Sequence, residues 1–146
     1  MRRYERPTGL DKRELVRKFC LSLGLLQPGD SRDVIVDIFY VILEAKTNKN
    51  GLTSDQIRQK VIELRQNYGL DDKGTAASNI RRQLRRLREL ILVEKVKNNY
   101  RISEFTSLKE IFENKIERFL IYNIVQRIKE YSQRVDQAFP KKDDGT

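Results

Sequence analysis

The sequence has no histidine and no tryptophan, and it has a single cysteine, Cys20. Without histidine the chain cannot build a Ser-His-Asp or Cys-His catalytic centre, nor the usual proton shuttle near neutral pH. One cysteine cannot form an internal disulfide or a structural zinc site. Among its apolar neighbours Cys20 is expected to be a small core residue. We therefore expect a protein that is not an enzyme, holds no metal or cofactor, and works in the reducing cytoplasm.

Long apolar runs are also missing. The longest, from Ile38 to Leu43, is far shorter than the roughly 20 residues that a membrane-spanning helix needs. Residues 1–7 are basic but are not followed by the apolar stretch of a signal peptide. The sequence therefore predicts a cytoplasmic protein with no membrane segment.

Positive charge is what the chain has in excess, with 30 Lys and Arg against 21 Asp and Glu and a net charge of +9. This excess is local. Residues 75–101 hold eight cations and two anions, a net +6, whereas residues 104–139 hold six of each and are neutral. A concentrated basic surface favours nucleic acid, or an acidic protein surface, as the partner.

Apolar periodicity predicts three helices in the first half of the chain. The first covers residues 11–26, where Leu15 and four later apolar residues recur at helical spacing before Pro28 and Gly29 stop it. The second begins at a cap on Asp30 or Ser31 and is apolar on most faces, so it is expected to be the central core helix. The third covers residues 54–67 and opens with a capping box formed by Thr53 and Gln56.

A fourth helix and a β-hairpin follow. The helix is predicted from Thr75 to about Leu90, with an apolar stripe made by Ile80, Leu84, Leu87 and Ile91. Residues 92–96 and 100–103 then alternate in the manner of strands. They are joined by Lys97-Asn98-Asn99, and the two asparagines tolerate the positive φ of a tight turn. Residues 52–53 form a short extended stub that is available to pair with the hairpin.

The order helix, helix, helix, hairpin across residues 31–103 resembles the winged helix-turn-helix proteins of bacteria and archaea, many of which are transcriptional regulators. Residues 51–57 resemble the entry into that family's second helix, residues 78–90 its recognition helix, and residues 92–95 and 100–102 its two wing strands. The resemblance covers about half the chain. The stretch 68–74 departs from it, because this connection is longer than the family's usual tight turn.

The fold class that follows is mainly α with a small β-hairpin wing. We expect four parts: residues 1–29 as a basic arm and N-terminal helix, residues 30–104 as a winged-helix DNA-binding domain, residues 105–139 as a long helix for dimerisation, and residues 140–146 as a tail. Arg2, Arg3 and Arg6 are candidates for an arm laid along DNA, although chain termini are commonly disordered.

The fourth helix carries the predicted recognition surface. At about 100° per residue, Ser78, Arg82 and Arg85 lie opposite the apolar stripe. Arginine suits bidentate contacts with guanine edges and phosphates. The other interpretation of such a helix is a solvated charged face, and the hairpin tip could likewise be an ordinary polar turn. The predicted DNA contacts are Thr75, Ser78, Asn79, Arg81, Arg82, Arg85, Arg86, Lys95, Lys97 and Arg101.

A final long helix is predicted from a second capping box at Ser107 to about Ala138. Its apolar residues recur every four positions, so in a straight α-helix the stripe would turn by roughly 200° along its length. Such a helix either faces two neighbours, with Leu108 to Leu120 on the chain's own helices and the later residues on a second subunit, or it breaks near Tyr122-Asn123 and folds back as two helices. The predicted homodimer interface comprises Leu120, Ile124, Ile128, Tyr131 and Val135.

These patterns together predict sequence-specific binding of double-stranded DNA by a homodimeric transcriptional regulator. The alternative is a winged-helix adaptor or interaction subunit of replication or transcription machinery, whose basic face docks on an acidic partner.

Overall fold

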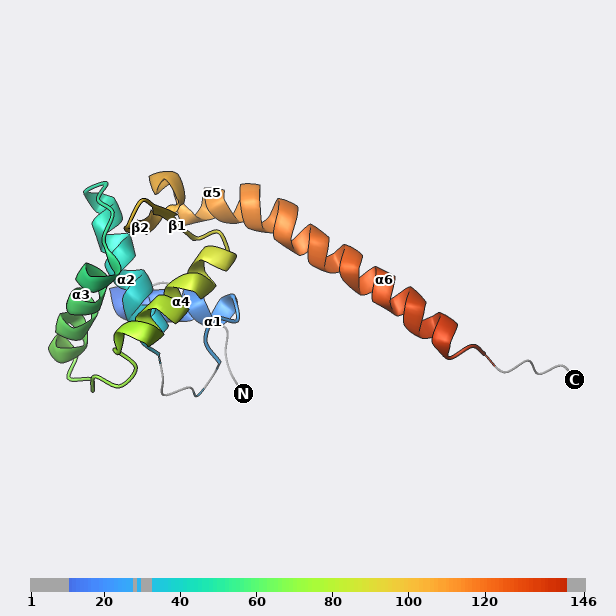
Figure 1. Ribbon diagram of the computed structural model, residues 1–146, viewed down its shortest axis with the longest axis horizontal. Helices are drawn as coiled ribbons and strands as arrows, with labels where there is room; N and C mark the ends of the chain where they lie inside the picture. The colour runs from blue at the N-terminus through green and yellow to red at the C-terminus, as the bar shows by residue number, and fades with distance from the viewer. Residues whose placement is uncertain (1–10, 28, 30–32, 142–146) are drawn as a thin grey trace, which may run out of the picture. The chain divides into compact units, whose positions relative to one another are not determined.

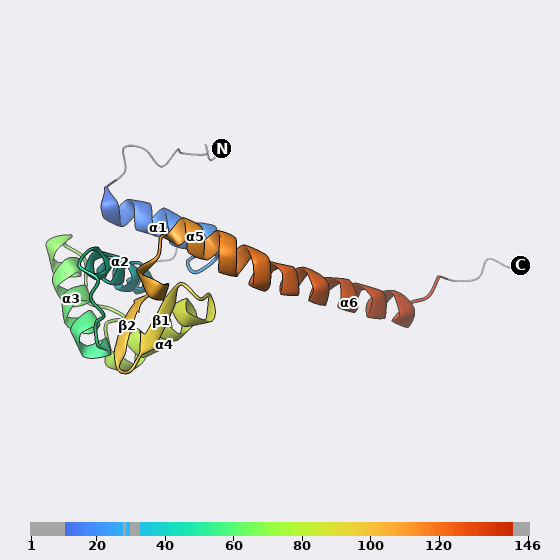
Figure 2. The same ribbon diagram turned by 90° about the horizontal axis from the view of Figure 1, so that it is seen from above.

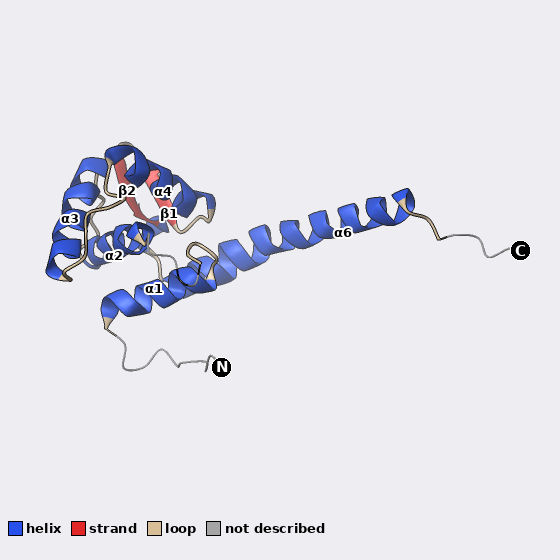
Figure 3. Ribbon diagram, turned by 90° about the horizontal axis from the view of Figure 1, so that it is seen from below, coloured by secondary structure: helices blue, strands red, loops and turns tan. Residues whose placement is uncertain are grey.

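The computed structural model describes residues 11–27, 29 and 33–141. The chain is mainly helical with one small antiparallel sheet, as predicted (Figures 1 and 3). It divides into two compact units at Thr106 and Ser107, called here the core unit and the C-terminal unit. The core unit contains α1 (Lys12–Ser22), α2 (Val34–Thr47), α3 (Ser54–Asn67), α4 (Ala77–Glu89), β1 (Val93–Val96), β2 (Asn99–Ile102) and the short helix η1 (Ser103–Phe105).

Helix α2 is the centre of the core unit, as its apolar sequence predicts. It packs against α1, α3, α4 and β2 (Figure 1). Seven apolar side chains from Val34 to Phe39 and from Val41 to Ile42 are buried among these partners, together with Asp37. Cys20 of α1 is also fully buried, and burial raises its pKa to about 12. The expectation that this cysteine is a core residue is confirmed.

Two helices of the core unit begin with capping residues that can be recognised in the sequence. The α3 capping box is present in both directions, with Thr53 Oγ1 accepting from the Gln56 N–H at 3.2 Å and Gln56 Oε1 accepting from the Thr53 N–H at 2.9 Å. Asp11 caps α1 through the Glu14 N–H. The predicted α2 caps Asp30 and Ser31 lie outside the described residues, as do Arg2, Arg3 and Arg6 of the predicted arm.

The start of α4 and its end both differ from the prediction. The helix begins at Ala77, because Thr75 is buried and turns back on the preceding loop: its hydroxyl donates to the Asp72 carbonyl at 2.6 Å. At the other end the chain leaves the helix through Ile91, which has a φ of +64°. Leu92 therefore takes the fully buried place that the helical period assigned to Ile91.

The sheet pairs Val93 with Ile102 and Val96 with Asn99, so the turn consists of Lys97 and Asn98. The positive φ lies on Lys97, at +58°, and on neither asparagine, which corrects the predicted role of the Asn-Asn pair. The predicted extended stub is confirmed, because Leu52 forms a bridge to Tyr100 with N···O distances of 3.0 and 2.7 Å.

A buried ionic cluster joins α1, α2 and α3, and no local pattern in the sequence indicates it. Arg13 donates to Asp37 at 2.8 Å and to Asp33 at 2.9 Å, and Arg65 donates to the same two carboxylates at 2.7 and 3.0 Å. Burial raises the pKa of Asp33, but the hydrogen bonds from Arg13 and Arg65 outweigh it and hold the pKa below its usual value. Asp33 occupies the N-cap position of α2, but its side chain accepts no capping hydrogen bond from the helix; it accepts hydrogen bonds from the two arginines instead.

The C-terminal unit is helical from Leu108 to Ala138: α5 (Leu108–Ile111), the π-helix η2 (Phe112–Ile121) and α6 (Tyr122–Ala138) run on without a break (Figure 1). Ser107 caps α5 through the Glu110 N–H. Because a π-helix has more residues per turn than an α-helix, a spacing of four stays closer to one face in η2 than the predicted 200° rotation implies. Ile121 and Tyr122 keep right-handed helical dihedrals, so the predicted alternative of a break at this point is wrong.

Candidate nucleic-acid interface

Successive side chains of an α-helix are about 100° apart around its axis. On this basis helix α4 presents three different faces. Ile80, Leu84 and Leu87 form the apolar face, and each is at most 1% exposed. On the opposite side, over an arc of about 120°, lie four exposed arginines, called here the arginine face: Arg81, Arg82, Arg85 and Arg88. The buried face fixes the rotation of the helix, so the arginines are held outward.

None of the salt bridges in the described part of the chain involves an arginine of this face. Glu89 is exposed at the end of the same face, four positions after Arg85, and is not paired with it. Like charges at helical spacings of three and four residues repel one another. An external polyanion would relieve this repulsion.

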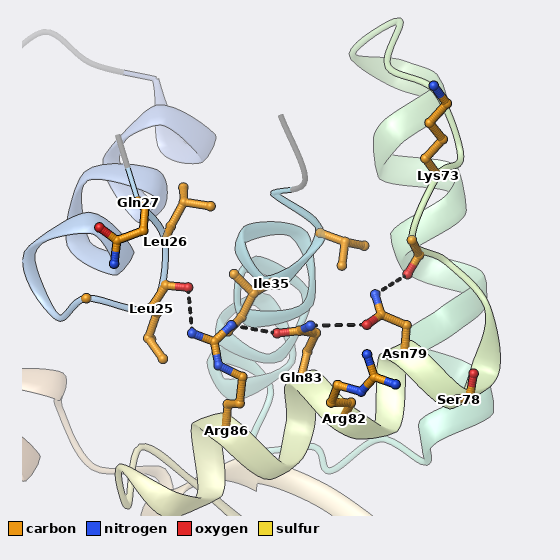
Figure 4. Close-up of a pocket in the computed structure, with 13 residues that line it drawn as sticks. Leu25, Leu26, Gln27, Ile35, Lys73, Ser78, Asn79, Arg82, Gln83 and Arg86 are labelled. Carbon is orange, nitrogen blue, oxygen red and sulfur yellow. Dashed lines mark hydrogen bonds between the residues drawn. The ribbon is translucent and has the colours of Figure 1, made fainter. Parts of the chain in front are cut away.

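The third face of α4 is a line of polar side chains that bond to each other. Asn79 donates to the Gly74 carbonyl at 2.7 Å, Gln83 donates to Asn79 Oδ1 at 3.1 Å, and Arg86 donates to Gln83 Oε1 at 2.9 Å (Figure 4). Arg86 also donates to the Leu25 carbonyl at 2.9 Å, which ties α4 to the segment after α1. The predicted contacts Asn79 and Arg86 are therefore engaged within the fold, as positioning residues beside the arginine face.

A cleft of about 680 Å³ adjoins this line. Ser78 and Arg82 reach it from the outward side of α4, Arg86 from the polar line, and Lys73 from the loop before the helix (Figure 4). Three cations around one concave surface make it suited to an anionic group. Lys73 and Arg88 are functional candidates that the sequence-based prediction omits. Arg88 could have been found, because it follows Arg81 and Arg85 at the same helical spacing.

The start of α4 is not capped by a side chain, since Ala76 occupies the N-cap position. Backbone N–H groups in the first turn of such a helix favour an anion. Thr75 does not belong to this surface: it is 6% exposed, its N–H and hydroxyl both donate to the Asp72 carbonyl, and its own carbonyl accepts from Arg58. This burial argues against the predicted role of Thr75 in DNA contact.

The hairpin offers fewer cations than predicted. Lys95 and Lys97 are exposed, with Lys95 Nζ lying 5.5 Å from the centre of the Tyr100 ring. Arg101 is different, because its Nε donates to Glu94 at 2.6 Å and its guanidinium lies 4.8 Å over the Phe105 ring. The charge of Arg101 is neutralised inside the hairpin, which argues against its predicted role in DNA contact.

Comparison with protein-family models, with curated proteins and with solved structures finds no match for this chain. Among the described residues no group of three or more acidic, cysteine or histidine side chains is placed to hold a metal ion. No helix within those same ranges is both long enough and apolar enough to span a membrane.

Proposed function

We propose that residues 33–103 form a winged helix-turn-helix domain that binds double-stranded DNA in a sequence-specific manner, within a homodimeric transcriptional regulator. The observation that carries this proposal is the arginine face of α4. Four exposed guanidinium groups project from a helix whose opposite face is locked in the core, and no described carboxylate pairs with them. The concentrated positive charge of such a surface attracts a polyanion.

The order of elements supports the winged-helix assignment. Helix α2, the bridge at Leu52, helices α3 and α4, and the β1–β2 hairpin follow one another as that fold requires (Figure 2). In this arrangement α4 is the recognition helix and the hairpin is the wing. The bridge between Leu52 and Tyr100 ties the entry of α3 to the hairpin, so the wing has a fixed attachment to the helices.

The geometry of α4 indicates which of its residues would contact bases and which would contact phosphates. Its 13 residues span about 20 Å, and a helix enters the major groove, which is about 12 Å wide. Arg82 lies nearly opposite the apolar face, with Ser78 and Arg85 beside it, so these three would meet base edges. Arg81 and Arg88 lie at the border of the face and would meet phosphates, as would Lys97 from the hairpin.

Binding to a random-sequence duplex over a salt series tests this function. A DNA-binding protein should bind the duplex at low salt. The logarithm of its binding constant should fall linearly with log[salt], because each phosphate contact releases counterions. Selection of fragments from a random duplex pool should then enrich one sequence. An adaptor that docks on an acidic protein would show little affinity for the duplex even at low salt, and that result would reject the proposal.

A further inference from the structure

The C-terminal helix carries an apolar stripe that the structure leaves open. No residue of α6 is buried, and Ile124, Ile128, Tyr131 and Val135 are 55–64% exposed. From Ile121 onward the spacing is no longer four: apolar residues recur at alternating intervals of three and four, the heptad pattern in which Ile121, Ile128 and Val135 are the a positions and Ile124, Tyr131 and Ala138 the d positions.

We propose that residues 121–138 pair with the same residues of a second copy of this chain as a parallel, in-register, two-stranded coiled coil. This deepens the proposed function and rests on the homodimer that belongs to it. The three a positions are all β-branched, as in parallel two-stranded coiled coils, although the d positions hold Ile124, Tyr131 and Ala138 and not the Leu usual there.

The charges beside the stripe select the parallel orientation. The g positions are Leu120, Arg127, Arg134 and Lys141, and the e positions include Val125, Ser132 and Phe139. In a parallel pair each g residue faces an e residue of the partner. Leu120 then meets the partner's Val125, Arg127 meets the partner's Ser132, and Arg134 meets the partner's Phe139, so no like charges are opposed.

An antiparallel pair would instead set g against g. With full overlap, where Ile121 faces the partner's Ala138, Arg127 would lie opposite the partner's Arg134, and symmetry would repeat this repulsion. The 3.8 Å pairing of Arg127 with Glu130 is exposed and would screen little of it. The basic g row therefore acts against the antiparallel arrangement.

The parallel orientation has a consequence for DNA binding. Because the core unit precedes the helix in both copies, both core units emerge from the same end of the coiled coil. The two α4 helices would then be available to one duplex, as a two-fold site requires.

Cysteine cross-linking of the full chain in the absence of DNA tests the orientation. In a Cys20→Ala background, Ala138→Cys should give a disulfide-linked dimer on mild oxidation, since only parallel pairing brings the two copies of residue 138 together. The matched control Gln137→Cys, one residue away and directed outward, should stay unlinked. The wild-type protein should have twice the 17.3 kDa mass of one chain by light scattering.

Several results would overturn the proposal: a monomeric or trimeric wild type, equal cross-linking at 137 and 138, or linkage between separately tagged Ile121→Cys and Ala138→Cys chains, which reports antiparallel pairing. An Ile124→Glu/Ile128→Glu variant should be a monomer that retains the thermal transition of the core unit. Since no DNA is present, linkage at residue 138 in a protein that binds no duplex would sustain this inference and reject only the proposed function.

Discussion

At the scale of single residues, the arginines of this protein serve two opposite purposes. Arg13 and Arg65 are at most 8% exposed and share two carboxylates, Asp33 and Asp37. The arginine face of α4 is exposed and has no such partners in the described chain. Burial distinguishes the two groups, and the sequence alone does not, because the two carboxylates that Arg13 and Arg65 share lie 20 to 32 positions away from them.

Removing one carboxylate of the buried cluster tests its structural role. Asp37→Ala leaves both arginines short of a partner in a site that water does not reach, so it should destabilise the protein by about 3–5 kcal/mol. Urea unfolding followed by circular dichroism measures the change. Asp136→Ala, at an exposed position of α6, removes the same charge and should change stability by less than about 0.5 kcal/mol. Equal effects of the two substitutions would contradict the role given to the cluster.

The same cluster predicts how stability depends on pH. The pKa of Asp33 is lower in the folded state than its usual value of 3.8, so its contribution is complete well above that value and is lost as the pH falls through the lowered pKa. Wild-type urea midpoints should therefore fall in acid. Asp33→Asn should have a lower midpoint at neutral pH and a flatter acid limb, and an acid limb as steep as that of the wild type would be evidence against this coupling.

At the scale of elements, the sequence predicts local features well. The bounds of α3 and its capping box follow from residues three apart, and the buried stripe Ile80, Leu84 and Leu87 follows from helical period alone. What the sequence misses depends on distant or irregular contacts. The burial of Thr75 is set by Asp72 and Arg58, the turn strain falls on Lys97, and a ten-residue π-helix has no simple apolar signature.

The candidate site shows the same division. Helical period identifies Ser78, Arg81, Arg82 and Arg85 as outward residues, and each is exposed. Asn79, Arg86 and Arg101 are also hydrogen-bond donors but are engaged by neighbours, and each has a partner close in sequence. The bond from Arg86 to the Leu25 carbonyl crosses 61 positions, and no pattern in the sequence marks it.

Attachment of the hairpin depends on a close approach at Gly51. A Cβ at this position would lie 2.8 Å from Asn99 Cβ, closer than two carbon atoms approach. Gly51→Ala should therefore destabilise the core unit by about 1–3 kcal/mol, measured by thermal or urea unfolding. Asn99→Gly removes the opposing Cβ, so the double substitution should recover part of the loss. A double variant no better than Gly51→Ala alone would show that this contact is not the cause.

At the scale of the whole molecule, the charge is divided unevenly along the chain. The excess lies on α4 and the hairpin, whereas residues 104–139 are neutral. A neutral helix is compatible with a second copy of itself, and a basic helix is compatible with DNA. In a parallel dimer the two basic surfaces add, and the salt dependence of binding should reflect the phosphate contacts of both.

Lys97 tests the part of this charge that carries no sequence information. It is exposed at the hairpin turn, and its proposed contact is a phosphate. Lys97→Ala should weaken binding to selected and random duplexes by the same factor and make the slope of log K against log[salt] shallower by about one per site removed. Loss confined to the selected duplex would instead assign Lys97 to base recognition.

Duplex binding by an Arg82→Ala/Arg85→Ala variant is the most direct test of the account. Fluorescence anisotropy would compare it with the wild type and with Lys12→Ala/Lys129→Ala, which removes two exposed cations from α1 and α6. Since each bidentate base contact contributes about 1–3 kcal/mol of discrimination, the arginine variant should lose its preference for the selected duplex while the lysine variant keeps it. Unchanged affinity and selectivity in the arginine variant would contradict the central claim that α4 reads DNA.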